Sequence, residues 1–311
     1  MAIQKIGVVG AGAWGTALAA AVRKSGREAL LWAFEPETVK DINSGHVNTT
    51  YLPDIPLDPA IQATGDMAEI GNRDAILMVT PAQHTRAIAG QLAESLPEGR
   101  PVVMCAKGIE QGTRSLMSQV LDEALPQATV AVLSGPSFAS EVAQGLPAAL
   151  TLACEDEKLG AELALAIGHA SFRPYWSRDV TGAQIGGAIK NVLAIAAGIV
   201  RGRKLGSNAH AAIVTRGFSE MVRFGKALGA RPETLTGLSG LGDLILTCGS
   251  PQSRNMSLGI ALGEGKTLDE VLGARKSVSE GVFTAYAVEE IAAEKNLDLP
   301  ICTAVHAVVS G

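Results

Sequence analysis

The sequence predicts an α/β protein with an N-terminal, mostly parallel sheet and an all-helical C-terminal part. A short β-rich run at Lys5–Val9 leads into the glycine-rich Gly10–Gly15 and then into a helical pattern. Strand and helix patterns alternate up to about residue 177, which is typical of a parallel sheet with right-handed crossovers. From Thr181 onward only helical patterns remain. We therefore expect two domains, residues 1–178 and residues 179–311.

The individual elements follow from hydrophobic periodicity and turn residues. After the first strand we expect strands at Ala29–Trp32, Ile61–Ala63, Ala75–Val79, Pro101–Met104, Thr129–Leu133, Leu150–Ala153 and Phe172–Trp176. In the first domain we expect helices at Thr16–Lys24, Arg86–Leu96, Arg114–Ala124 and Glu157–Ile167. In the second we expect them at Gln184–Val200, Ala209–Leu228, Ser257–Leu262, Leu268–Leu272, Thr284–Lys295 and Cys302–Val309. The segment Asp41–Pro59 is rich in Pro, Asn and Asp and is predicted to be a loop.

Composition narrows the class of protein. The chain has 311 residues, is 47% hydrophobic and carries a formal net charge of −5, so a large core is expected and no nucleic acid or anionic membrane is indicated as a partner. Its four cysteines are scattered without a C-x-x-C pair, and its five histidines lack metal-ligand spacing. We predict reduced thiols, no metal and a cytoplasmic location. Ile3–Val9 runs directly into a strand pattern, so no signal peptide is expected.

The run Gly10–Gly15 reads G-A-G-A-W-G and matches the G-x-G-x-x-G fingerprint between a strand and a helix. Gly10 permits a tight turn, Gly12 lets a pyrophosphate approach the backbone, and Gly15 lets the helix pack on the strand. The helix N-terminus offers free N–H groups to the phosphates. We therefore interpret residues 1–178 as a Rossmann-like dinucleotide-binding domain, the alternative being a glycine-rich turn without a ligand.

Phe34 and Glu35 follow the second expected strand, and Glu35 lies twenty positions after Gly15. An acid at this place can bind the ribose 2′-hydroxyl of NAD, whereas no Arg or Lys lies between Leu30 and Val39 to bind a 2′-phosphate. Phe34 offers an uncharged face to the adenine. The sequence thus favours NADH over NADPH, although Glu35 can equally be a surface carboxylate.

Lys190 is the most unusual residue, because it sits in the apolar run Gln184–Val200. Thr181 and Gln184 form a T-x-x-Q pattern that predicts a capping box at the helix start. The run is shorter than a membrane span and charged at its middle, so no membrane span is expected. A lysine here requires an anion, a polar cavity or a shifted pKa. The structural alternative is an ion pair or a lysine whose head reaches the surface.

Residues at the ends of the expected strands can bind an anion, since ligands of parallel sheets lie beyond the carboxyl ends of the strands. Lys107 follows the strand Pro101–Met104, and Gly135 with Ser137 follows Thr129–Leu133. Lys107 is therefore a candidate anion ligand, or else a solvated loop lysine.

Between the later helices, three glycines precede Asp243 in Gly237–Gly242, and Ser253–Asn255 reads S-R-N at a helix start. Glycines next to an acid suggest a backbone pressed against a neighbour. Arg254 can form a two-pronged contact with an anion that a helix N-terminus also favours. The plain alternative is a helix cap with a surface arginine.

Six motifs in this order resemble the bacterial type of NAD(P)-dependent glycerol-3-phosphate dehydrogenase. They are Gly10–Thr16, Cys105–Glu110, Ser134–Ala139, Gly187–Ala194, Gly240–Asp243 and Ser253–Asn255. The resemblance runs from Ile6 to about Val305. It implies interconversion of dihydroxyacetone phosphate and sn-glycerol 3-phosphate for phospholipid synthesis, with NAD or NADP as cofactor, by a cytoplasmic homodimer.

The resemblance also implies roles for residues. Lys190 matches the catalytic lysine, with Asp243 and Lys107 beside the reacting groups. The implied substrate contacts are Lys107, Gly135, Ser137, Lys190, Asn191, Asp243, Thr247, Ser253, Arg254 and Asn255. The implied cofactor contacts, taken with the fingerprint, are Gly10, Gly12, Ala13, Trp14, Gly15, Phe34, Glu35, Lys107, Ala139, Arg254, Val278 and Glu280.

Two other functions share part of this pattern. A dehydrogenase for a hydroxy acid or a sugar nucleotide has the glycine fingerprint but no need of Ser253–Asn255. A nucleotide-sensing module without catalysis needs neither Lys190 nor Asp243. An assay with dihydroxyacetone phosphate and with its unphosphorylated analogue separates the three.

Overall fold

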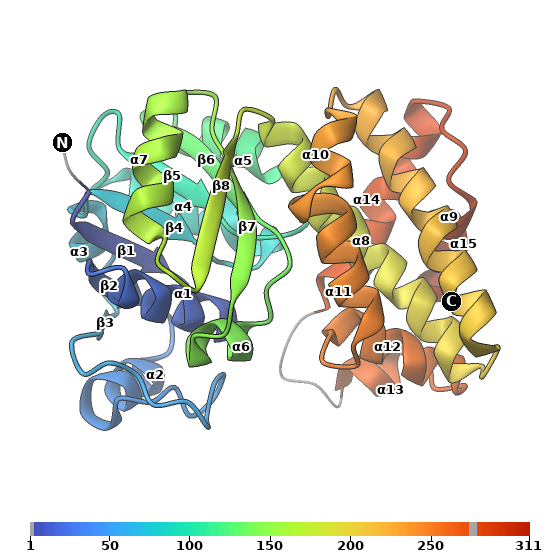
Figure 1. Ribbon diagram of the computed structural model, residues 1–311, viewed down its shortest axis with the longest axis horizontal. Coiled ribbons are helices and arrows are strands. Elements are labelled where there is room, and N and C mark those ends of the chain that lie inside the picture. The colour runs from blue at the N-terminus through green and yellow to red at the C-terminus, as the bar shows by residue number, and fades with distance from the viewer. Residues whose placement is uncertain (1–2, 274–278) are drawn as a thin grey trace.

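The computed structural model describes residues 3–273 and 279–311. Figure 1 shows a sheet covered by helices, with helices α8 to α15 gathered to one side of it. The strands are β1 (Lys5–Val9), β2 (Glu28–Trp32), β3 (Gln62–Thr64), β4 (Ala75–Met78), β5 (Pro101–Met104), β6 (Thr129–Ser134), β7 (Ala148–Ala153) and β8 (Phe172–Ser177). Their order in the sheet is β3-β2-β1-β4-β5-β6-β7-β8. Every neighbouring pair is parallel except β6 with β7, which is antiparallel. The predicted fold class is confirmed.

Helices connect the strands and then continue alone. Those of the sheet region are α1 (Ala13–Lys24), α2 (Pro36–Lys40), α3 (Met67–Gly71), α4 (Thr85–Ala93), α5 (Met117–Ala124), α6 (Ala139–Gln144) and α7 (Glu157–Ile167). Those that follow are α8 (Val180–Gly202), α9 (Gly206–Ala227), α10 (Pro232–Thr236), α11 (Asp243–Gly249), α12 (Arg254–Gly263), α13 (Leu268–Gly273), α14 (Glu280–Glu294) and α15 (Pro300–Ser310).

Successive residues of the buried strands face opposite sides of the sheet, as the period of two requires. In β4, Leu77 joins the core that contains α1, α6 and α7, whereas Ile76 and Met78 join the core that contains α3, α4 and α5. A third core is formed by the later helices, with α8 through its middle. The sheet is therefore covered on both faces, which explains why its strands read as continuous apolar runs.

Helix α8 begins earlier than predicted. Its N-cap is Asp179, whose carboxylate accepts from the backbone N–H of Gly182 at 2.8 Å and from that of Arg231 at 2.8 Å. The predicted capping box at Thr181 and Gln184 is wrong, because both residues lie inside the helix. The Gln184 amide instead accepts from the Ser118 N–H at 2.7 Å and donates to its hydroxyl at 2.9 Å. It thus ties α8 to α5.

The length argument against a membrane span is also wrong, since α8 has 23 residues and is long and apolar enough to cross a bilayer. However, 89% of its most apolar window is buried inside the protein. The apolar character of α8 is explained by its central place among the other helices. Within residues 3–273 and 279–311, no other helix meets the length and apolarity of a span.

Glycines bring α8 and α12 unusually close together. A Cβ built on Gly198 would lie 2.8 Å from the Cα of Gly259, and one on Gly202 would lie 3.0 Å from the Cα of Gly263. No larger side chain fits at these crossings without separating the helices. The two helices are therefore packed backbone against backbone over two successive turns.

Two further segments differ from the prediction. Arg114 has a positive φ of 61°, so it ends a turn and α5 begins only at Met117. The segment predicted as a loop begins with a π-helical turn at Asp41–Gly45. The ends of the following loop, residues 46–57, are joined, because the Leu57 N–H donates to the His46 carbonyl at 2.8 Å.

Candidate active site

The carboxyl ends of β5 and β6 place Lys107 beside Gly135. The Lys107 ammonium donates to the Gly135 carbonyl at 2.9 Å, and the Ser137 hydroxyl donates to the same carbonyl at 3.1 Å. Gly135 has a φ of +155°, and a Cβ there would lie 2.9 Å from the Cα of Leu150 on β7. The three predicted strand-end residues therefore lie together.

Asp243 joins Lys107 to Lys190. One of its carboxylate oxygens, Oδ1, accepts from Lys190 Nζ at 2.7 Å, and the other, Oδ2, accepts from Lys107 Nζ at 2.8 Å. The Lys190 ammonium also donates to the Thr247 hydroxyl at 2.9 Å. The side chain of Asp243 is 1% exposed and that of Lys190 is 9% exposed, so this is a buried ion pair. The alternative of a lysine head in open solvent is excluded.

Lys190 is nevertheless shifted toward its neutral form. Burial lowers its pKa from 10.5 to about 8, and the positive charge of Lys107 acts in the same direction. The Asp243 carboxylate opposes this decrease but does not cancel it. Desolvation therefore outweighs the carboxylate, a balance that sequence patterns cannot resolve. A lysine with such a pKa can donate a proton as the ammonium and accept one as the neutral amine near neutral pH.

Asparagine side chains tie the neighbouring backbone to this centre. The Asn191 amide donates to the Lys107 carbonyl at 3.2 Å, which links α8 to the loop after β5. The Asn255 amide oxygen accepts from the Gly281 N–H at 3.1 Å, which links α12 to α14. Both residues were predicted as substrate contacts, and both are largely buried.

The start of α12 places Ser253 and Arg254 side by side. Ser253 is the N-cap, and its hydroxyl accepts from the Met256 N–H at 3.2 Å. Burial raises the pKa of the nearby Glu280 carboxyl, while the Ala82 N–H and the positive charge of Arg254 act against that rise. Glu280 Oε1 accepts from Ala82 N–H at 3.1 Å, and its Oε2 is buried without a partner among the described residues.

The glycine fingerprint has the geometry of a dinucleotide site. Gly10 has a φ of +112°, and a Cβ on Gly15 would collide with the Gly10 carbonyl. A Cβ on Gly12 would meet no described protein atom within 4 Å, so internal packing does not require a glycine there. Trp14 Nε1 is buried without a partner in the described part of the chain. The open space at Gly12 fits a bound dinucleotide.

The remaining cofactor candidates are distributed around this turn. Ala13 is the first residue of α1 and Ala139 is the first residue of α6. Phe34 is 80% exposed at the end of the second strand. Val278 lies outside the described residues.

Two residues near Glu35 were missed by sequence reasoning. The Tyr51 hydroxyl donates to Glu35 Oε1 at 3.0 Å. The buried Asn48 amide donates to the Ala11 carbonyl and to the Thr16 hydroxyl, each at 2.8 Å. The sequence signal that could have found them is the segment 46–57, in which polar residues stand among apolar ones. The apolar Leu52, Ile55 and Leu57 are buried there.

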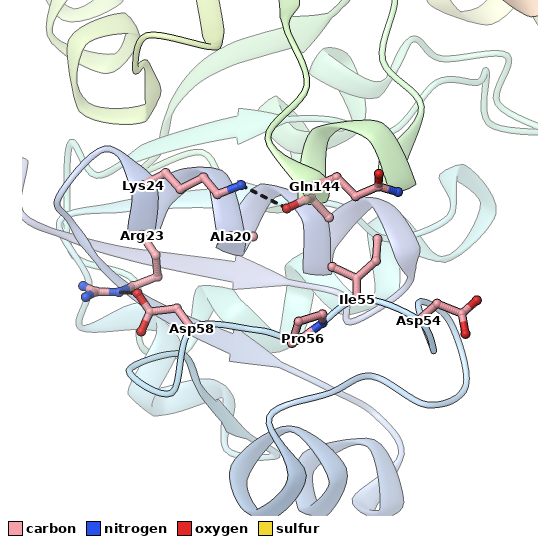
Figure 2. Close-up of a pocket in the computed structure, with 9 residues that line it drawn as sticks. Ala20, Arg23, Lys24, Asp54, Ile55, Pro56, Asp58 and Gln144 are labelled. Carbon is pink, nitrogen blue, oxygen red and sulfur yellow. Dashed lines mark hydrogen bonds and ion pairs between the residues drawn. The ribbon is translucent and has the colours of Figure 1, made fainter.

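A surface cavity of about 570 Å³ lies between α1, α6 and the segment 54–58 (Figure 2). Its two basic residues have partners: Lys24 donates to the Ala143 carbonyl at 3.0 Å, and Arg23 pairs with Asp58 at 3.4 Å. Among the predicted site residues that the structure describes, none lines this cavity. It is therefore separate from the paired lysines.

The sheet with its glycine fingerprint, and Lys190 on α8 bridged through Asp243 to Lys107 after β5, are typical of a class, the two-part NAD(P)-dependent dehydrogenases. The particular family follows from sequence comparison. Residues 5–160 match the N-terminal and residues 179–311 the C-terminal profile of NAD-dependent glycerol-3-phosphate dehydrogenase. The chain belongs to this family.

Relatives cover the whole chain. It is 61% identical over 311 residues to the glycerol-3-phosphate dehydrogenase [NAD(P)+] of Parvibaculum lavamentivorans, covering 100% of this chain and 93% of the relative. The enzyme of the same name from Caulobacter vibrioides is 56% identical, with 100% and 94% covered. The crystal structure of glycerol-3-phosphate dehydrogenase from Coxiella burnetii has a TM-score of 0.94 at 37% identity, with 99% of this chain and 94% of that chain covered.

Proposed function

We propose that this chain interconverts dihydroxyacetone phosphate and sn-glycerol 3-phosphate with NAD(P)H as hydride donor. Family membership over nearly the whole chain supports the reaction. The single structural observation that supports it best is the Lys190–Asp243–Lys107 bridge, which gathers two cations and one anion at the strand ends. A sensing module has no use for such a bridge.

Lys190 is the proposed proton donor. The bound cofactor supplies hydride to the substrate carbonyl carbon, and negative charge develops on the carbonyl oxygen. A cation held beside that oxygen stabilises the charge and donates the proton. Asp243 and Thr247 fix the direction of the ammonium by accepting two of its three hydrogens. In the oxidative direction, the neutral amine of Lys190 removes the proton of the alcohol.

Lys107 is proposed to contact the same end of the substrate, since it shares Asp243 with Lys190. Arg254 at the first turn of α12 is proposed to bind the phosphate, together with Ser253 and Asn255. The helix N-terminus adds its positive potential there. Binding energy from the phosphate then orients the carbonyl at the reacting end.

The fingerprint turn is proposed to hold the cofactor pyrophosphate, with Glu35 on the adenosine ribose and Trp14, Ala139 and Glu280 toward the other half. A carboxylate at position 35 accepts from a 2′-hydroxyl and repels a 2′-phosphate. We therefore propose a preference for NADH, although the relatives' names include both cofactors.

The biological setting is also proposed. Glycerol phosphate made by this reaction supplies phospholipid synthesis. The four cysteines are free and buried, which supports a cytoplasmic location. We further propose a homodimer, on the resemblance to the family, and a domain boundary between residues 178 and 179, just before α8 begins at Val180.

The test is NADH oxidation by the purified protein with dihydroxyacetone phosphate, repeated with unphosphorylated dihydroxyacetone. We expect rapid turnover of the phosphate ester and very slow turnover of the free ketone. Equal rates would contradict the phosphate site. No turnover of either, with normal NADH binding, would favour a dehydrogenase for another substrate, whose class the same assay can search with hydroxy-acid and sugar-nucleotide substrates.

A further inference from the structure

Tyr51 and Glu35 form a polar pair at the edge of the nucleotide site. Glu35 is the N-cap of α2, in the connection that follows β2. Tyr51 lies sixteen positions later, in the loop 46–57. The Tyr51 hydroxyl is the donor and Glu35 Oε1 is the acceptor, at 3.0 Å. One carboxylate oxygen is thereby engaged by the protein itself.

The position of Tyr51 is fixed from the fingerprint turn. Its backbone N–H donates to Asn48 Oδ1 at 3.1 Å. The amide nitrogen of Asn48 donates to the Ala11 carbonyl, in the glycine turn, and to the Thr16 hydroxyl on α1. Asn48 is only 1% exposed, so these bonds are shielded from water. Asn48 therefore ties the backbone of Tyr51 to the glycine turn, and the side chain of Tyr51 in turn contacts Glu35.

The far end of the same loop is anchored on α1 as well. Figure 2 shows Ile55 and Pro56 lying across from Ala20, with Asp58 beside Arg23. Arg23 also donates to the Arg27 carbonyl at 2.7 Å. The loop 46–57 itself contains no Lys or Arg, so the side chain that it contributes beside Glu35 is a phenol.

We propose that Tyr51 is a specificity-determining residue that fixes Glu35 so that the carboxylate accepts a cofactor 2′-hydroxyl and rejects a 2′-phosphate. This rests on the proposed function of Glu35 at the ribose and names what makes it selective. A free glutamate can rotate away from a phosphate at little cost. A glutamate whose Oε1 is bound by Tyr51 keeps its charge in place and leaves Oε2 for the ribose.

The chemistry of the pair suits this role over the whole working range of pH. Burial raises the pKa of the Tyr51 phenol, and the hydrogen bond to Glu35 raises it further. The phenol therefore stays protonated and keeps donating to the carboxylate. Tyr51 acts through Glu35 and needs no contact with the reacting atoms.

The test measures dissociation constants of NADH and NADPH by calorimetry, together with kcat and KM for both, in the wild type and in Tyr51→Phe. We expect NADH binding to weaken by about threefold to tenfold, as for a lost hydrogen bond that orders a charged acceptor, with NADPH binding unchanged or tighter. The ratio of the NADPH dissociation constant to the NADH dissociation constant should fall, while kcat with NADH stays at the wild-type value. Tyr175→Phe, which removes a phenol that is 54% exposed on β8, is the matched control and should leave the ratio unchanged.

A double-mutant cycle shows whether Tyr51 works through Glu35. In a Glu35→Ala background, Tyr51→Phe should no longer alter the ratio of the constants. An unchanged ratio in the single variant, or the same fall in both backgrounds, overturns the proposal. If the wild type binds NADH but does not turn over dihydroxyacetone phosphate, the proposed function fails, and the binding constants still decide on the pair. Equal melting temperatures of the variants exclude unfolding as the cause of any change.

Discussion

The proposed reaction centre around Lys190 and the proposed nucleotide edge around Glu35 are built on opposite physical principles. At the proposed reaction centre, Lys190 and Asp243 are buried, Lys107 is partly buried, and each is bound by a partner from a distant part of the chain. At the nucleotide edge, Phe34 is 80% exposed and Glu35 is bound by a residue sixteen positions away. One region depends on long-range burial of charge and the other on local contacts near the surface.

This difference sets the size of effect that substitution should have. In a buried site, a removed partner leaves an uncompensated charge, at a cost of about 3–5 kcal/mol. At an exposed edge, water replaces most of what is lost, and single contacts contribute about 1 kcal/mol. Changes at the lysine bridge should therefore alter turnover strongly, and changes at the nucleotide edge should adjust selectivity.

The largest effect is expected for Lys190→Ala. The variant removes the proposed proton donor, so kcat should fall by ~10²-fold or more. The NADH dissociation constant should stay close to that of the wild type. Steady-state kinetics and calorimetry measure the two quantities. Lys226→Ala, at an exposed position of α9, is the control, and turnover like that of the wild type in Lys190→Ala would remove Lys190 from its role.

Arg254→Ala should act on binding rather than on chemistry. Charged hydrogen bonds contribute roughly 1.5–3 kcal/mol each, so KM for dihydroxyacetone phosphate should rise by about tenfold to a hundredfold. The ratio of activities on the phosphate ester and on dihydroxyacetone should fall in parallel. Arg201→Ala, at an exposed end of α8, serves as the control. A constant activity ratio would place the phosphate elsewhere.

The pH dependence should report the reduced pKa of Lys190. Reduction requires the protonated ammonium, whose folded-state pKa is lowered to about 8. Because the protonated fraction declines above that pH, kcat/KM for reduction should fall by about tenfold per pH unit there. Oxidation, which needs the neutral amine, should increase up to about the same pH. In Asp243→Asn the decline of the reduction rate should begin at a lower pH, because the Asp243 carboxylate raises the pKa of Lys190. A decline that begins at the same pH would show that another group titrates.

The smallest effect is expected at the nucleotide edge. NADH should exceed NADPH in kcat/KM by about tenfold, equivalent to roughly 1.4 kcal/mol. The double variant Phe34→Arg, Glu35→Ser should narrow or reverse that preference, because it replaces a repelling charge with an attracting one. Side-by-side kinetics with both reduced cofactors measure the ratio. A wild type that prefers NADPH would refute the assignment of Glu35.

The two regions also differ in what sequence patterns could predict. The strands were found within a few residues because a sheet buried on both faces requires continuous apolar runs. The fingerprint was found because its glycines serve a local turn. By contrast, the shared carboxylate joins residues 53 and 136 positions apart, and no local pattern encodes such a pairing. The Asp179 cap is a local contact three residues long, and it was missed because the T-x-x-Q pattern two residues later predicts a competing helix start. The Tyr51 hydrogen bond was missed because the fold of the loop 46–57, and no local pattern, brings Tyr51 to Glu35.

The glycine crossing of α8 and α12 has a consequence for the choice of substrate. Lys190 is carried by α8, and Arg254 begins α12. The two backbones lie so close at Gly198 and Gly202 that a larger residue at either position would force the helices apart. The proposed proton donor and the proposed phosphate ligand are therefore carried by two helices whose backbones pack directly against each other. A substrate that contacts both residues must therefore match the separation that this helix packing sets between them.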